Sequence, residues 1–330
     1  MIEVTKPGLH DTVQDLGRFD YQKFGVVAGG AMDPYSHRIA NLLVGNEKRE
    51  ATLEMTFVGP RLLFREAALI AICGGDFTPT MEGLPVPMWR PVFIRKGSEL
   101  RFGAAKAGCR AYLAVAGGLD VPLVLGSRST YVKAGLGGLD GRALIKGDVV
   151  QVMSASGLAE VMKKRLSSDA LFRAADWQIA QKFLPTLSNH YEIRVMRGRQ
   201  YELFDEASRH RFWNEPFTVS SQSDRMGYRI NGPALHLEEA EEMISEAVTY
   251  GSIQVPADGN PIILAADRQT TGGYPKIGQL SSIDFTKLAQ AKAGDQLLFK
   301  EVTIEESHCL FTKQEMNLKA LLAAIRNRFS

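Results

Sequence analysis

The sequence lacks the cysteine pattern of a disulfide framework or of a zinc site. It has only three cysteines, Cys73, Cys109 and Cys309, and no CxxC pair. An odd number of widely spaced cysteines predicts neither kind of cross-link. Cys73 and Cys109 lie in apolar runs, so we expect them to be buried structural thiols.

An excess of charge of either sign is also absent. The chain carries 39 basic and 37 acidic residues, a net charge of +2. This balance predicts no binding to nucleic acid or to an anionic membrane. The apolar runs extend over about seven residues, which is too short to cross a bilayer. The first residues do not have the pattern of a signal peptide, so we expect a cytoplasmic protein.

Several catalytic motifs are missing as well. There is no G-x-x-x-x-G-K-[ST], so the sequence does not predict a P-loop ATPase. Gly135–Gly138 begins like a dinucleotide fingerprint, but Asp140 replaces its last glycine and no βαβ pattern surrounds it. Neither H-E-x-x-H nor G-x-S-x-G occurs. No dedicated metal site is expected in the chain.

What the sequence does contain is a strand-and-turn pattern long enough for two cores. Short runs rich in β-branched and aromatic residues alternate with glycine-containing turns. We therefore expect a mainly β fold with a few helices. In the first half, the predicted strands cover 62–64, 68–73, 92–94, 99–102 and 112–115.

Three helical segments interrupt this pattern. Asp33 is a good N-cap and Pro34 suits the first helical position, so a helix is predicted over 35–44. Apolar residues at helical spacing predict a helical connector over 157–188. A further apolar stripe predicts a C-terminal helix within 307–330, packed on its own domain.

The two β regions look like distant copies of each other. Three glycine motifs recur in the same order, and their spacing places an insertion after Pro261. The expected domains are a first β domain (1–156), the connector (157–188), a second β domain (189–306) and the C-terminal helix (307–330). The matched motifs are Val58–Leu62 with Asn231–Leu235, Glu82–Pro85 with Asp258–Pro261, and Lys96–Phe102 with Ala293–Phe299.

Dense polar loops supply the candidate site residues of the first half. Arg18 and Asp33 lie beside glycines whose N–H groups would suit an anion, although Asp33 could act only as a helix cap. Arg128 and Ser129 offer a guanidinium and a hydroxyl to a carboxylate or phosphate, although a plain turn explains them equally well. Glu54 interrupts an apolar stretch, and Arg18 or Arg61 would pair with it.

The second half contains two similar loops. One holds Asp224, Arg225 and Arg229, and the other lies within the insertion. A simple interpretation is an Asp–Arg ion pair that supports a loop. The functional interpretation is a pocket for a small polar acid, with Arg at its carboxylate and backbone amides at a developing oxyanion. The candidates in the insertion are Asp267, Arg268, Gln269, Thr270, Thr271, Gly272, Gly273 and Tyr274.

These same stretches resemble the KipA family, whose members are also known as the C subunits of 5-oxoprolinases. The family is related to allophanate hydrolase subunit 2 and to the carboxyltransferase region of urea carboxylase. The likeness covers roughly residues 1–300. It is carried by Thr12–Arg18, Gly30–Asp33, Ala40–Asn46, Arg110–Gly118, Leu125–Thr130, Ser223–Arg229, Ile253–Pro256 and Asp267–Pro275.

The resemblance implies two cyclophilin-like β-barrel domains and a complex with two partner chains, one KipI-like and one LamB/YcsF-like. Such a complex hydrolyses 5-oxoproline to L-glutamate at the expense of ATP, with ATP and Mg²⁺ acting at the level of the complex. It also implies an alternative role as a regulator of sporulation that counteracts a KipI-like antikinase. A second alternative is a biotin-dependent carboxyltransferase component, although biotin itself is not expected because the biotin-carrier and carboxylase regions are missing.

Specific roles can be assigned to the candidates if the substrate is a lactam. A lactam is resonance-stabilised like a peptide bond, and phosphorylation of its oxygen would activate it. We expect Arg225, Arg229 and Arg268 at phosphate or substrate carboxylate. Asp224 and Asp267 would orient these arginines or bind Mg²⁺, and residues 270–273 would form a cradle.

Overall fold

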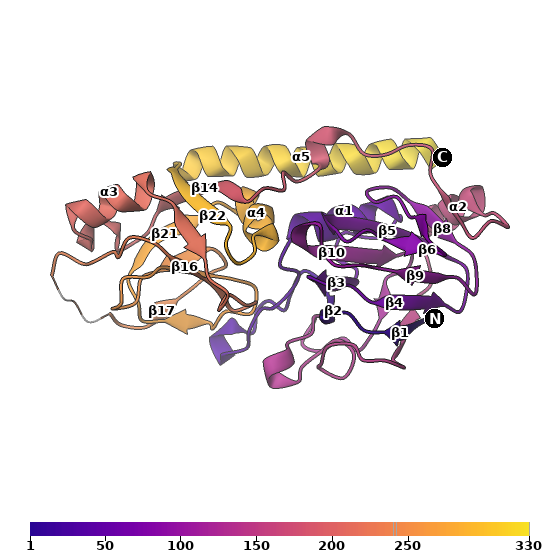
Figure 1. Cartoon of the computed structure of the whole chain (residues 1–330), viewed down its shortest axis with the longest axis horizontal. Coiled ribbons are helices and arrows are strands. Elements are labelled where there is room, and N and C mark those ends of the chain that lie inside the picture. Colours follow the sequence, from indigo (N-terminus) through magenta and orange to yellow (C-terminus); the bar gives the residue numbers. More distant parts are fainter. Residues whose placement is uncertain (240, 242, 330) are drawn as a thin grey trace. The chain divides into compact units, whose positions relative to one another are not determined.

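The computed structural model describes residues 1–239, 241 and 243–329, and these fall into two compact units (Figure 1). Ser330, at the end of the expected C-terminal helix, lies outside the described residues, as do two residues of the expected second β domain. Both units are mainly β, as the sequence predicts. Unit 1 comprises Met1–Arg18, Asp33–Pro185 and Met316–Ser330, and unit 2 comprises Phe19–Met32 and Thr186–Glu315.

Unit 1 contains a seven-stranded and a six-stranded sheet. Apolar residues of both sheets, such as Leu62, Phe64, Ile72 and Leu113, share one buried cluster, which is how two packed sheets form a core. The first sheet has the order β11 (Leu119–Asp120), β12 (Val149–Val152), β1 (Ile2–Lys6), β4 (Arg61–Phe64), β9 (Glu99–Arg101), β6 (Thr80–Met81), β7 (Leu84–Pro85). The second has the order β13 (Phe172–Ala174), β8 (Val92–Ile94), β5 (Ala68–Asp76), β10 (Ala107–Val115), β3 (Thr52–Thr56), β2 (His10–Gln14).

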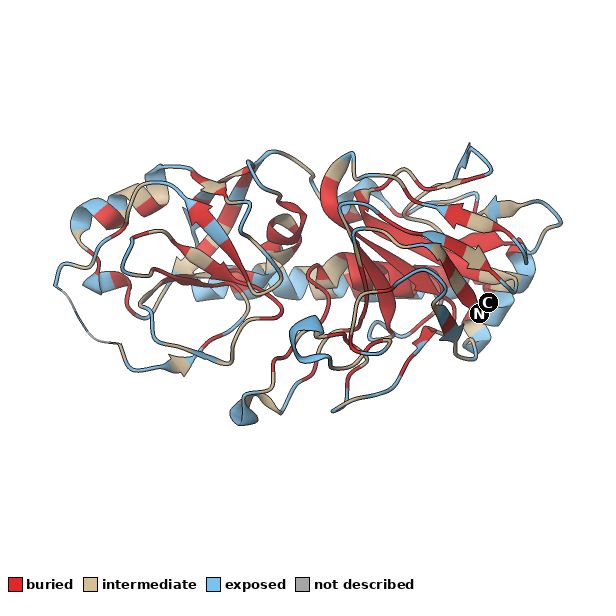
Figure 2. Ribbon diagram, turned by 60° about the horizontal axis from the view of Figure 1, so that its bottom comes forward, coloured by how far each residue is buried: buried red, intermediate tan, exposed pale blue. Residues whose placement is uncertain are grey.

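Strands β5 and β10 are almost wholly buried because helix α1 (Pro34–Leu43) packs against them (Figures 1 and 2). The helix begins as predicted. Asp33 is the N-cap and accepts the Ser36 N–H at 3.0 Å, and Pro34 occupies the first turn. Gly45 follows the helix with a φ of +75°, a conformation that favours glycine.

Unit 2 is a closed seven-stranded barrel. Burial alternates along its first strand, where Tyr191, Ile193 and Val195 face the interior. The first and last strands pair in parallel, which closes the ring. The order is β14 (His190–Arg197), β21 (Lys276–Leu280), β18 (Ser252–Gln254), β19 (Ile262–Leu264), β16 (Gly227–Asn231), β15 (Phe217–Val219), β22 (Gln296–Glu301), and β17 (Glu246–Ala247) pairs with β20 (Thr271–Gly272) outside it.

Aromatic side chains fill the barrel. Phe212, on helix α3 (Glu206–Asn214), stacks on Phe299 with 4.7 Å between ring centroids. The Phe217 ring lies 5.5 Å from the Phe299 ring, measured between centroids.

Several shorter helical segments occur in the two units. They are α4 (Phe285–Gln290), η1 (Gln22–Phe24), η2 (Val132–Ala134), η3 (Gln181–Phe183), η4 (Tyr201–Leu203) and η5 (Ser282–Asp284).

Two of the three matched glycine motifs have the same local structure in both units. Gly83 and Gly259 have φ values of +82° and +79°, and each lies in a turn between antiparallel strands. Gly97 and Gly294 have φ values of +83° and +90°, and each comes shortly before a strand. The third pair differs, since the first-half motif precedes β4 and the second-half motif follows β16.

The connector is α-helical only in its first third, and a single 3-10 turn, η3, lies near its end. Helix α2 (Gly157–Leu166) forms as expected, but β13 pairs with β8 at the edge of the six-stranded sheet. The helical prediction is therefore wrong for Phe172–Ala174. The open edge of a sheet offers backbone hydrogen-bond partners to a segment distant in sequence, and the spacing of apolar residues does not reveal them.

The C-terminal helix α5 (Ile304–Phe329) begins three residues earlier than expected. Its predicted apolar stripe is buried, with Leu318, Leu321, Ile325 and Phe329 between 2% and 8% exposed. Within the described residues, no helix has both the length and the apolar character needed to span a membrane.

Candidate functional site

The main candidate site lies in unit 2, at one end of strands β16 and β19. These strands are antiparallel, with Gly227 opposite Leu264. The residues just before β16 therefore adjoin those just after β19. The ladder continues beyond the strands, because the Asp267 N–H donates to the Arg225 carbonyl at 2.8 Å. Two loops that are far apart in sequence are held together in this way.

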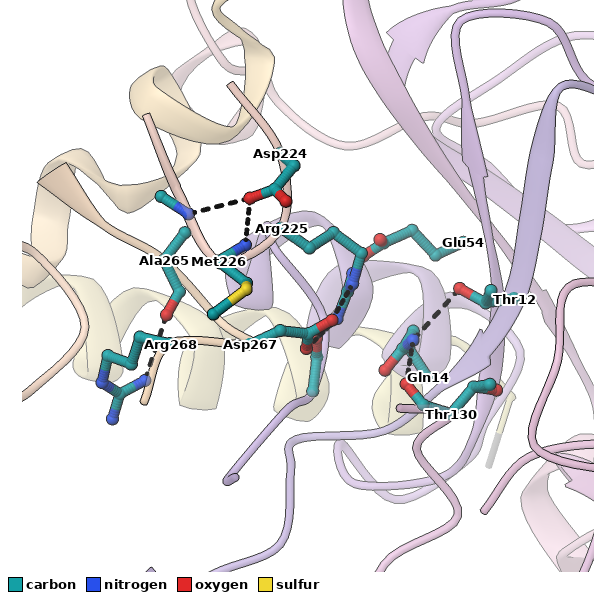
Figure 3. Close-up of polar contacts among 12 residues, drawn as sticks. Thr12, Gln14, Glu54, Thr130, Asp224, Arg225, Met226, Ala265, Asp267 and Arg268 are labelled. Carbon is teal, nitrogen blue, oxygen red and sulfur yellow. Dashed lines mark hydrogen bonds and ion pairs between the residues drawn. The ribbon is translucent and has the colours of Figure 1, made fainter. Parts of the chain in front are cut away.

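Arg225 and Asp267 form an ion pair with two hydrogen bonds, of 2.9 and 3.0 Å (Figure 3). Their side chains are only 11% and 9% exposed. Arg225 also donates through Nη2 to the Gly30 carbonyl at 2.7 Å. The simple interpretation of the sequence thus describes these two residues well. The Arg225 guanidinium is engaged by the protein itself.

Arg268 is in a different situation (Figure 3). Its Nη1 donates to the Ala265 carbonyl at 3.2 Å and its Nε to the Val248 carbonyl at 3.4 Å. No carboxylate among the described residues forms an ion pair with it. Burial lowers the pKa of Arg268, while Tyr250 and Asp267 act in the opposite direction. This half-buried cation has donors left for an anionic ligand.

The other two charged candidates near this site are Asp224 and Arg229. Asp224 is exposed, and its Oδ1 accepts the N–H groups of Met226 and Gly227 at 2.7 and 3.2 Å. It therefore shapes the turn before β16. Arg229 lies on an exposed position of β16. The structure does not bring Arg229 to the Arg225–Asp267 pair through any described hydrogen bond or ion pair.

The Thr270–Gly273 stretch is part of a small sheet. Thr271 and Gly272 form β20, and the Thr270 carbonyl accepts the Val248 N–H at 3.1 Å. Gly272 and Gly273 do not have positive φ values. An added Cβ at Gly272 would lie 2.5 Å from Gln254 Nε2, so the Gln254 amide would have to move. Gln269 is half-buried beside them.

A pocket of about 370 Å³ adjoins the end of this stretch, at Gly273 and Tyr274. Its wall is mostly apolar, and Tyr274 itself is 49% exposed. Neither Arg225 nor Arg268 is among the described residues that line it. The arginines and this pocket are therefore separate features of unit 2.

Tyr250 is a functional candidate that the sequence did not reveal. Its hydroxyl donates to the Met32 carbonyl at 2.8 Å, and its ring stacks on Phe285 at 4.2 Å. It also influences the pKa of Arg268. A single tyrosine in a Thr-Tyr-Gly turn carries no motif, so only the fold could reveal it.

In unit 1, the candidates Arg18, Arg128 and Ser129 are organised by Asp15. Asp15 accepts the Ser129 hydroxyl at 2.5 Å and the Arg128 N–H at 2.6 Å. Arg18 is fully buried and donates to the Val124 and Ser129 carbonyls. Gln14 also ties this loop to β2, because its Nε2 donates to the Thr130 carbonyl at 3.0 Å (Figure 3). These contacts favour the plain-turn interpretation.

A second buried polar group of unit 1 lies beneath α1. The Tyr112 hydroxyl donates to Glu54 Oε2 at 2.8 Å and accepts the Asp33 N–H at 2.7 Å. Burial and the charges of Glu54 and Asp33 raise the pKa of Tyr112 well above its usual value. Tyr112 is thus a partner of Glu54 that sequence reasoning, which proposed Arg18 or Arg61, did not foresee.

His37, on α1, is a further buried polar residue of unit 1. It is fully buried, its Nδ1 lies 2.9 Å from Thr52 Oγ1, and burial lowers its pKa to about 4. It is therefore neutral near pH 7. Among the described residues, no three His, Cys, Asp or Glu side chains gather as a metal ion would require.

Known proteins are similar to this chain in sequence and in overall fold. Residues 24–301 match the family described as carboxyltransferase domain, subdomain A and B. The chain is 35% identical to the 5-oxoprolinase C subunit of Haemophilus influenzae over 318 residues, 96% of each chain. It is 37% identical to the 5-oxoprolinase C subunit of Escherichia coli over 308 residues, 93% of each chain.

The crystal structure of urea amidolyase from K. lactis is also similar. The TM-score is 0.87 at 31% identity, covering 97% of this chain and 20% of that one. The chain thus spans about a fifth of this larger protein. Taken together, the family match and the full-length relatives show that the chain belongs to the carboxyltransferase domain, subdomain A and B, family, as do the C subunits of 5-oxoprolinases.

Proposed function

We propose that the chain is the C subunit of an ATP-dependent 5-oxoprolinase, acting with two partner chains to convert 5-oxoproline to L-glutamate. The observation that carries this proposal is the end-to-end similarity to two proteins of that name, at 35% and 37% identity. The similarity covers 93% to 96% of both chains. The partners that fit this role are a KipI-like chain and a LamB/YcsF-like chain, in the cytoplasm.

Arg268 is the residue that best fits the substrate. 5-Oxoproline combines a carboxylate with a cyclic amide. The guanidinium of Arg268 bonds only to backbone carbonyls among the described residues. A partly desolvated guanidinium attracts a carboxylate more strongly than an exposed one does, and its planar donors match the two oxygens. Arg268 therefore binds the substrate carboxylate.

ATP and Mg²⁺ are assigned to the proposed complex as a whole. ATP would supply phosphoryl activation of the lactam oxygen. The sequence has no P-loop, and the described residues contain no group of three metal-ligating side chains. We therefore assign ATP and Mg²⁺ to the complex without naming residues of this chain that would hold them.

The test is an assay of the reconstituted complex of all three subunits. We expect ATP turnover that depends on 5-oxoproline. Arg268→Ala should lower kcat/KM by about 10- to 100-fold, which is the value of a hydrogen bond to a charged group. Arg268→Lys should retain more activity than Arg268→Ala, because lysine keeps the positive charge but lacks the planar guanidinium that binds both carboxylate oxygens.

Complex formation, followed by size-exclusion chromatography, should be the same for wild type and Arg268→Ala. Unchanged kinetics in Arg268→Ala would remove Arg268 from the site. Absence of 5-oxoproline-dependent turnover in the wild-type complex would refute the proposed function.

Carboxyl transfer is a second candidate, favoured by the TM-score of 0.87 to a urea amidolyase. It predicts incorporation of labelled bicarbonate with a biotinylated carrier, and no turnover without biotin. A third candidate is a KipA-type regulator that binds a KipI-like antikinase. It predicts tight binding of the KipI-like chain and no turnover by any combination of subunits.

A further inference from the structure

Unit 2 includes the segment Phe19–Met32, which is attached to the barrel at two carbonyl groups. Arg225 Nη2 donates to the Gly30 carbonyl at 2.7 Å. The Tyr250 hydroxyl donates to the Met32 carbonyl at 2.8 Å. The Met32 side chain is fully buried in the barrel's hydrophobic core. The backbone between these two attachments is therefore held in place.

Two N–H groups in or beside this attached stretch, those of Gly30 and Ala31, have no acceptor among the described residues. Gly30 and Ala31 are buried, and none of the described residues accepts a hydrogen bond from either N–H. Buried backbone N–H groups nearly always have a partner, which is protein, water or ligand. The described residues supply no acceptor for the N–H groups of Gly30 and Ala31.

Arg225 determines where the Ala31 N–H points. In a planar trans peptide, the carbonyl of one residue and the N–H of the next point in opposite directions. Fixing the Gly30 carbonyl toward Arg225 therefore fixes the Ala31 N–H away from it. A charged donor on the carbonyl also polarises the peptide and strengthens its N–H as a donor. Gly29 and Gly30 have φ values of +64° and +94°, which a side chain would disfavour.

Arg225 is itself held by Asp267, with both side chains about nine-tenths buried. Asp267 immediately precedes Arg268, and Tyr250 and Asp267 both influence the charge of Arg268. Tyr250, which bonds to the Met32 carbonyl, and Asp267, which holds Arg225, thus also act electrostatically on the proposed carboxylate-binding arginine. All of them belong to unit 2.

We propose that the Ala31 N–H, together with that of Gly30, donates to the carbonyl oxygen of the amide substrate, and that Arg225 and Asp267 are positioning residues for this donor. The inference rests on the proposed function, because it takes the ligand to be a cyclic amide whose carboxylate is bound by Arg268. An amide oxygen already carries partial negative charge by resonance. It is therefore an acceptor that suits backbone N–H donors.

The experiment compares 5-oxoproline with its thiolactam analogue, in which sulfur replaces the ring carbonyl oxygen. Sulfur is the weaker acceptor, so wild type should favour the oxygen substrate. Arg225→Lys and Asp267→Asn should lower kcat/KM for 5-oxoproline by about 3- to 10-fold, the value of one hydrogen bond. The kcat/KM for the thiolactam should fall by a smaller factor. The ratio of kcat/KM for 5-oxoproline to that for the thiolactam should therefore be smaller in both variants than in wild type.

The matched control is Arg197→Lys. Arg197 also pairs with a carboxylate, Glu301, but these side chains are 51% and 45% exposed. This variant should keep the wild-type preference. A purely structural role for Arg225 would lower kcat/KM equally for both substrates, and that result would overturn the inference. Addition of guanidinium ion to Arg225→Ala should restore part of the oxygen preference.

Failure of the proposed function gives a different result. If the wild-type complex shows no 5-oxoproline-dependent ATP turnover, calorimetric binding of lactam and thiolactam to the whole chain replaces the assay. Tighter binding of the lactam that is reduced in Arg225→Lys would support the inference. Equal binding of the two ligands, or binding of neither, would mean that the N–H groups bond only to buried water.

Discussion

At the scale of single residues, Asp11 shows what burial does to an ionisable group. It is 1% exposed, its Oδ2 accepts the Gly8 N–H, and its Oδ1 has no partner among the described residues. Burial raises the pKa of Asp11 from 3.8 to about 7, against a smaller lowering by the Gly8 bond. A carboxyl group without a cation beside it resists ionisation in this way.

This shift predicts a pH dependence of folding. Between pH 3.8 and about 7 the folded state binds more protons at Asp11 than the unfolded state does. Stability therefore falls as the pH rises through this window. Asp11→Asn should remove this slope. The free energy of unfolding of the variant, relative to that of wild type, should therefore rise by about 2–4 kcal/mol between pH 4 and pH 8.

Urea denaturation at several pH values measures this difference. His37 acts in the opposite direction, because its lowered pKa of about 4 makes stability rise with pH between that value and 6.5. His37 is present in both proteins, so the difference between them isolates Asp11. Parallel stability curves for the two proteins would contradict the assignment.

Among the elements, strand β21 shows how closely the barrel interior is packed. Gly278 lies on this strand, and an added Cβ would come within 2.6 Å of Val195 Cγ1. Ile253 and Phe212 lie 3.3 Å from the same position. Neighbours on three elements would have to move at once.

Gly278→Ala should therefore lower the free energy of unfolding by about 1–3 kcal/mol. The matched control is Gly157→Ala at the start of α2, where an added Cβ meets nothing within 4 Å. The control should be neutral or stabilising, because alanine restricts the unfolded chain. Chemical denaturation compares the two variants. A Gly278→Ala protein as stable as the control would contradict the prediction, because it would show that the barrel accommodates the added methyl group.

Local sequence signals were sufficient for many of these elements. All five strands predicted in the first half correspond to β4, β5, β8, β9 and β10, because alternation and turn residues act over a few positions. Helix α1 is likewise specified by Asp33 and Pro34. Strand β13 was missed because its partner lies elsewhere in the chain.

The candidate site was only partly predictable for the same reason. The sequence identified Arg225, Asp267 and Arg268 as candidates, but not which one is engaged by the protein. Arg225 meets Asp267 across 42 residues and Gly30 across 195. Such pairings depend on the order of strands in the barrel, which no local pattern encodes. Only these contacts distinguish a positioning arginine from one with donors to spare.

For the whole molecule, α5 is the element that both units share. Residues up to Glu315 belong to unit 2 and those from Met316 to unit 1. Near its end, Ile325 is 2% exposed and contributes to the wall of a pocket of about 470 Å³ with Trp177, Ile179 and Phe183. The last turns of the chain are thus part of the packing of unit 1.

Ile325→Ala should accordingly destabilise unit 1 by about 2–5 kcal/mol. Limited trypsin digestion should then cut faster at Lys182, which lines the same pocket. Met316→Ala on the same helix is the control, since Met316 is 65% exposed and its loss should change little. Equal cleavage rates in both variants would contradict the packing role of the stripe.

The way the barrel closes has a consequence for synthesis on the ribosome. Strand β22 is the last strand translated, and it pairs with both β14 and β15. A nascent chain that stops short of Gln296 therefore leaves two strands of unit 2 with unpaired backbone edges. Such edges template association between chains. Truncation before Gln296 should thus yield aggregates rather than a smaller folded protein.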